Sequence, residues 1–118
     1  MTQDDLITAA LALLDPARWQ VAIDRTIITA DASETSTDGA VRGAVLSLDV
    51  RGNCHNLVRV EYGLVDVHPV PSGPGGQQCI DPHRELCEVR AYVSPADALT
   101  MIRVAVAHAE SMLDEVAT

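Results

Sequence analysis

Apolar side chains recur at steps of three and four residues near both ends of the chain, which is the pattern of a helix with one buried face. In the first segment these positions are Leu6, Ile7, Ala10, Leu11 and Leu14. Thr2 stands where the N-cap of this helix is expected, and Asp15-Pro16 interrupts the pattern. We therefore expect the first helix to lie between Thr2 and Asp15.

The second helical segment begins with a clear start signal. Ser94 is the expected N-cap, Pro95 occupies the first helical position and Asp97 the capping-box position. From there the apolar stripe continues to the end of the chain through Ala98, Ile102, Ala105, Ala109, Met112 and Val116. The pattern predicts one long carboxyl-terminal helix.

The middle of the chain has the composition of a β-sheet. Dense Val, Ile and Thr, with turn residues between them, predict four strands, over residues 19–30, 41–51, 54–67 and 84–93. The polar residues 31–39 and the proline- and glycine-rich residues 68–82 are expected to be loops. Gly52-Asn53 is typical of a two-residue hairpin turn between the second and third strands.

A two-residue turn at Gly52-Asn53 determines which residues face each other. Val45 would then lie opposite Val60, and Gly43 opposite Tyr62, on the buried side of the sheet. We therefore expect residues 1–118 to form one α+β domain. Its four-stranded, mostly antiparallel sheet carries the amino- and carboxyl-terminal helices on one face, in the order αββββα.

The same register turns an apolar patch away from the predicted core, near the hairpin tip. Its candidate partner-binding residues are Leu46, Leu48, Val50, His55, Leu57 and Arg59. An exposed apolar patch with a charged rim is typical of a binding surface. The competing interpretation is that a helix or the first strand covers these side chains.

Composition excludes several classes of function. The chain has no lysine. Its 8 arginines are outnumbered by 17 acidic residues, which gives a formal net charge of −9. This rules out a P-loop lysine or a Schiff-base nucleophile and disfavours direct binding to nucleic acid or to anionic membranes. No stretch reaches the roughly 20 apolar residues of a membrane span, and the amino terminus lacks a signal-peptide pattern. We expect a cytoplasmic protein with reduced thiols.

One group of residues has the chemistry of a metal site. His68, Cys79, His83 and Cys87 would approach one another if the strands before and after the long loop are neighbours, and Cys₂His₂ suits zinc. Their spacing matches no common zinc module, so the competing interpretation is a buried cysteine with loop histidines and no cofactor.

No catalytic set is apparent in the sequence. Cys54 and His55 are adjacent on a predicted strand and point to opposite faces, and no G-x-S-x-G elbow occurs. We therefore expect a protein that is not an enzyme.

The remaining class is a protein-binding module. We expect an acidic inhibitor, encoded by a phage or mobile element, that occupies the basic surface of a nucleic-acid-handling partner. Its acidic surface would include Asp31, Glu34, Asp38, Asp114 and Glu115. Two alternatives stay open: a structural subunit of a phage tail or head–tail assembly in the virion, which would form homo-oligomers, and a small zinc-stabilised domain.

Overall fold

The computed structural model describes residues 1–37, 39–51, 57–67, 69–70, 79–80 and 84–117. Along these ranges the elements are α1 (Gln3–Ala12), β1 (Gln20–Asp24), β2 (Ile27–Thr35), β3 (Val41–Asp49), β4 (Val58–Val67), β5 (Pro69–Val70), β6 (Cys79–Ile80), β7 (Arg84–Val93) and α2 (Pro95–Ala117). Five strands form an antiparallel sheet in the order β1-β2-β3-β4-β7, and β5 pairs with β6 apart from it.

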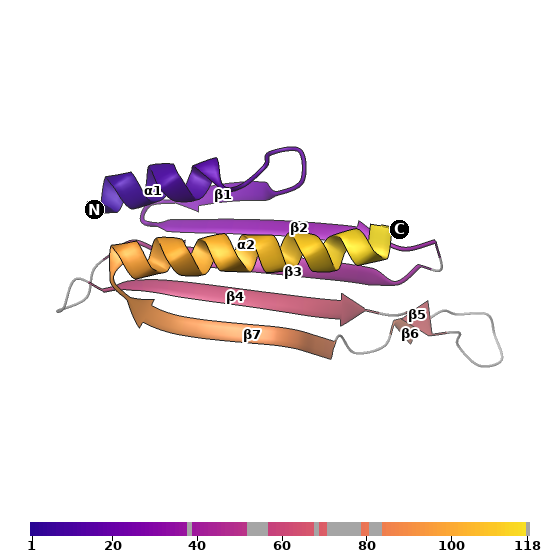
Figure 1. Cartoon of the computed structure of the whole chain (residues 1–118). Coiled ribbons are helices and arrows are strands. Elements are labelled where there is room, and N and C mark those ends of the chain that lie inside the picture. Colours follow the sequence, from indigo (N-terminus) through magenta and orange to yellow (C-terminus); the bar gives the residue numbers. More distant parts are fainter. Residues whose placement is uncertain (38, 52–56, 68, 71–78, 81–83, 118) are drawn as a thin grey trace.

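Both helices lie on the same face of this sheet, as predicted (Figure 1). Helix α2 crosses β2, β3 and β4, and α1 lies beside α2 on the side of β1. The predicted apolar stripes are the buried ones: Leu6, Ala10 and Leu14 from the first segment, and Ala98, Ile102 and Ala109 from α2. The α+β class and the placement of the helices are confirmed.

The predicted caps define where both helices begin. The Asp5 amide donates to Thr2 Oγ1 over 3.0 Å, and the Thr2 amide donates to the Asp5 carboxylate over 3.2 Å, which completes a capping box. At α2 the Asp97 amide donates to Ser94 Oγ over 3.2 Å. These bonds satisfy amides that the first helical turn leaves without a backbone acceptor.

The sheet has five strands because the first predicted strand, over residues 19–30, folds as a hairpin. Asp24 lies opposite Ile27, so Arg25 and Thr26 form the turn. Arg25 has a φ of 56°, a left-handed conformation that side chains other than glycine seldom adopt. Strand β2 then runs to Thr35, into the segment that was expected to be a loop.

The register between β3 and β4 differs from the prediction. Leu46 lies opposite Tyr62 and Leu48 opposite Val60, whereas a two-residue turn would pair Val45 with Val60. The strands end at Asp49 and begin again at Val58, and the Gly52-Asn53 turn itself lies outside the described residues. The shift is an odd number of residues, so it moves every β3 side chain to the opposite face.

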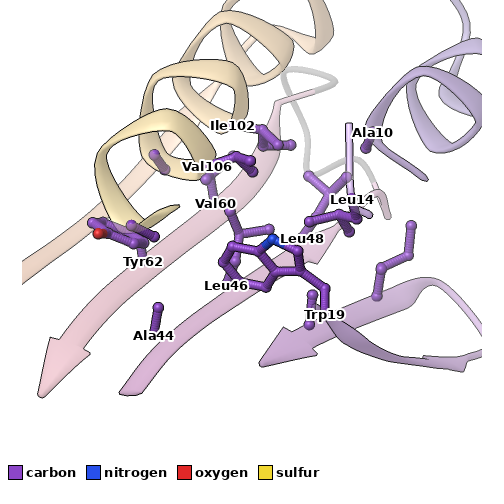
Figure 2. Close-up of a cluster of buried hydrophobic side chains, with 14 of the residues drawn as sticks. Ala10, Leu14, Trp19, Ala44, Leu46, Leu48, Val60, Tyr62, Ile102 and Val106 are labelled. Atoms are coloured by element: carbon purple, nitrogen blue, oxygen red, sulfur yellow. The ribbon is translucent and has the colours of Figure 1, made fainter. Parts of the chain in front are cut away.

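The predicted apolar patch is therefore part of the core. Leu46, Leu48 and Val50 are 1%, 0% and 3% exposed, and they pack under the helices with Val60 and Tyr62. Figure 2 shows Leu46 and Leu48 beside the buried ring of Trp19. Val45, which was predicted to be buried, is 46% exposed on the open face of the sheet. The expectation that these three residues form an exposed binding surface was wrong.

Candidate functional site

The remaining residues of the predicted patch do not form a continuous surface. Arg59 lies on the open face of the sheet, where its guanidinium group is paired with Glu61. Leu57 is half-buried just before β4 begins, and His55 lies outside the described residues. Any role of these residues in partner binding stays a prediction.

The predicted zinc ligands fall largely outside the described part of the chain. His68 and His83 are not described, and for Cys79 and Cys87 the structure gives only a backbone position, in β6 and β7. Among the described residues, no three His, Cys, Asp or Glu side chains are grouped so as to hold a metal ion. The zinc hypothesis stays a prediction.

Four of the five predicted acidic-surface residues are described, and three of them gather around α2. Glu34 of β2 and Asp114 of α2 share one cation, Arg18, and Glu115 lies 3.5 Å from Arg42. Asp31 lines a small hollow of about 150 Å³ that Arg18 also lines. Asp38 lies outside the described residues.

Arg18 is the centre of this cluster. It follows α1 in the chain, and its guanidinium group reaches Asp114, Glu110 at 3.5 Å and Glu34 at 3.6 Å. The hydrogen bond that Arg18 donates to Asp114, together with the negative charge of the three carboxylates, raises the pKa of Arg18 above its ordinary value. The segment between α1 and β1 is thereby joined to the last turns of α2.

Arg42 forms a second, more buried centre next to the first. Its guanidinium group donates to the Met112 carbonyl over 3.3 Å, and it lies 3.9 Å from the Asp66 carboxylate and 3.5 Å from that of Glu115. Asp66 is 5% exposed, and it is opposite Arg42 in the sheet. Ionised groups at such depth need a charge partner because burial removes their hydration.

We call the set of Glu34, Asp66, Glu110, Asp114 and Glu115 the carboxylate end. Its five carboxylates face two guanidinium groups, those of Arg18 and Arg42. It also surrounds the carboxyl-terminal turns of α2, where the helix dipole is negative, and the last turn holds no basic residue. The site therefore keeps a surplus of negative charge that is well placed to accept cationic side chains.

A second feature, which sequence reasoning missed, is an apolar groove between α2 and the edge of the sheet. It has a volume of about 380 Å³ and is lined by Val60, Tyr62 and Val89 below and by Met101, Val104 and His108 above. The Tyr62 hydroxyl lies 2.9 Å from His108 Nδ1, and the two rings meet edge to face. The groove exists because α2 lies over β2, β3 and β4 and leaves β7 uncovered.

The Tyr62–His108 pair had no signal in the sequence. The two residues are 46 positions apart, and the wrong register gave no reason to place Tyr62 beneath this part of α2. The Tyr62 hydroxyl and the His108 imidazole are therefore hydrogen-bonded polar groups in the wall of a mainly apolar groove. Thr100 also lines the groove, and the expectation that this protein is not an enzyme stays a prediction.

Comparison with known protein families, with curated proteins and with solved structures finds no match for this chain. Within the described residues, neither helix combines the length and the apolar character that a membrane crossing requires.

Proposed function

We propose that this chain is a non-enzymatic, acidic protein-binding module that inhibits a nucleic-acid-handling partner by occupying its basic surface. The carboxylate end is the binding site in this proposal. The polar, charged surface around the last turns of α2 takes the place of the predicted apolar patch, whose Leu46, Leu48 and Val50 belong to the core.

The observation that supports this proposal is the placement of Asp114 and Glu115. Both lie in the last turns of α2, next to the negative end of the helix dipole, and no basic residue of the last turn offsets them. Such a carboxylate destabilises a helix by about 0.3–1 kcal/mol. Asp114 pairs with Arg18 and Glu115 with Arg42, yet both carboxylates stay largely exposed, so the end of α2 keeps acceptor oxygens that a partner's cationic groups can reach.

The chemistry of the site selects a partner rich in arginine or lysine. Asp114 and Glu115 are 63% and 65% exposed, so a partner's side chains can reach them without rearrangement of the fold. The formal net charge of −9 adds a long-range attraction that speeds association with a basic protein and repels nucleic acid. The module would therefore compete with nucleic acid for one surface of the partner.

Two variants of equal net charge distinguish binding by the carboxylate end from a general effect of the protein's negative charge. Glu110→Gln, Asp114→Asn and Glu115→Gln together neutralise the carboxylate end. Asp4→Asn, Asp24→Asn and Asp97→Asn remove the same charge from exposed positions elsewhere. We expect wild type and the second variant to capture the same basic protein from lysate of the source cell, and the first variant to lose it.

The affinity for that protein should also fall as salt is added, because exposed charge pairs are screened. Equal capture by the two variants, or an affinity that does not respond to salt, would show that the carboxylate end is not the binding site.

A further inference from the structure

Strand β7 is an edge of the five-stranded sheet. It pairs with β4 along one side, and among the described residues no strand pairs with its other side. The register with β4 moves between Leu64↔Cys87 and Val65↔Glu85, so β7 has one extra residue, Leu86, near its start. From residue 87 to 93 the strand is regular, and its outer amide and carbonyl groups are available for pairing with another strand.

The charges on β7 restrict how a second copy of this chain could pair with it. When two identical strands pair antiparallel about a two-fold axis normal to the sheet, the axis falls on one residue, and positions equally far from it face each other. An axis at Glu88 would oppose two carboxylates, and an axis at Arg90 would oppose two guanidinium groups. An axis at Val89 instead places each Glu88 opposite the Arg90 of the other copy.

The neighbouring side chains suit this register. Glu88 and Arg90 are 53% and 57% exposed on the open face, and within one chain they lie 3.8 Å apart. Arg90 is oriented by Glu61 of β4, whose carboxylate lies 3.2 Å from Arg90 Nε. Val89 is 41% exposed on the helix side, at the margin of the apolar groove, and would be covered by Val89 of the second copy. Paired aliphatic side chains and opposite charges across strands each stabilise a sheet.

At the other edge of the sheet, the charges do not favour one pairing register over another. Strand β1 has five residues, and Asp24 is the one charged side chain among them. No axis on β1 can bring opposite charges together, so its pairing would have no preferred register.

We propose that two copies of this chain form a two-fold dimer by pairing their β7 strands antiparallel about Val89, which joins their sheets into one. The regular ladder spans residues 87–91 of each copy, and Glu88 of each copy pairs with Arg90 of the other. This dimer goes beyond the proposed partner binding and uses a different part of the molecule.

Charge variants test the dimer through a mixing experiment. We expect sedimentation velocity of the wild type to give twice the chain mass of 12.6 kDa. Glu88→Arg places two arginines opposite each other, and Arg90→Glu places two glutamates, so each variant alone should dissociate at a concentration about tenfold higher or more. Circular dichroism checks that each variant is folded.

Mixing the two variants should restore the dimer, because one copy then carries both arginines and the other both glutamates. The double variant Glu88→Arg/Arg90→Glu should dimerise with itself. Asp31→Arg, on the same face but on β2, is the control and should leave the dimer unchanged.

Several results would overturn the proposal. They are a wild type that stays monomeric at millimolar concentration, assemblies larger than a dimer, a Glu88→Arg protein that dimerises as the wild type does, and a mixture that stays monomeric.

Discussion

The Tyr62 hydroxyl lies 2.9 Å from His108 Nδ1, and this contact connects β4 to α2 on the wall of the apolar groove. Tyr62 is 5% exposed, whereas His108 is exposed, so the bond is made where the core meets solvent. A net contribution of about 1 kcal/mol is expected for a hydrogen bond in such a position.

A double-mutant cycle measures this contribution. Tyr62→Phe and His108→Ala should each reduce the free energy of unfolding, and the double variant should lose less than the sum of the two. We expect a coupling of about 1 kcal/mol from urea denaturation. Losses that simply add would show that the hydroxyl and the imidazole do not interact in solution.

The register of β3 can be tested with two single substitutions. Leu48→Ala removes a fully buried side chain and should destabilise the protein by about 2–5 kcal/mol. Val45→Ala, three residues away on the open face, should cost less than about 1 kcal/mol. The two-residue turn predicted from Gly52-Asn53 demands the opposite order, so comparing the two unfolding midpoints discriminates between the registers.

The helices could be predicted from the sequence because their signals are local. Thr2, Ser94 and Pro95 identify where the helices begin, and the three- and four-residue spacing identifies their buried faces. The first hairpin was missed because its turn, Arg25-Thr26, contains neither glycine nor asparagine. Residues 19–30 contain no other turn signal, so their composition predicts one continuous strand.

The faces of β3 were assigned wrongly for a different reason. Both faces of this strand carry aliphatic residues, Val41 and Val45 on one and Leu46 and Leu48 on the other, so alternation alone does not identify the core. The predicted register therefore depended on Gly52-Asn53 alone. A two-residue turn at that dipeptide is a shorter connection than the one between Asp49, where β3 ends, and Val58, where β4 begins. The carboxylate end could not be predicted as a unit, because its members come from β2, β4 and α2.

Within the carboxylate end, Asp66 forms a buried ion pair with Arg42. Arg42→Met should destabilise the protein by about 3 kcal/mol, because it removes a positive charge from beside a buried carboxylate. Adding Asp66→Asn to that variant should recover part of the loss. A double variant less stable than Arg42→Met would show that Asp66 does not depend on Arg42, and chemical denaturation of the three proteins decides this.

The capping box of α1 predicts a pH effect. The hydrogen bond from the Thr2 amide, followed by the one with its side chain, lowers the pKa of Asp5 below 3.8. Because the folded-state pKa is the lower one, the stabilisation is complete above the unfolded-state pKa and is lost as the pH falls through the folded-state value. An NMR titration should place the pKa of the Asp5 carboxyl below 3.8. Thr2→Ala removes the side-chain hydrogen bond but keeps the backbone amide, so it should raise this pKa only part of the way towards 3.8; a wild-type pKa at or above 3.8 would contradict the capping box.

The proposed function requires that basic protein groups bind at the carboxylate end and at no other acidic part of the surface. The most direct test is to titrate ¹⁵N-labelled protein with a nona-arginine peptide and follow the amide signals. We expect the largest shifts at residues 110–117 and around Glu34 and Arg42, and we expect them to disappear in the Glu110→Gln/Asp114→Asn/Glu115→Gln variant. Shifts of equal size at Asp4, Asp24 and Asp97, or shifts that persist in that variant, would contradict it.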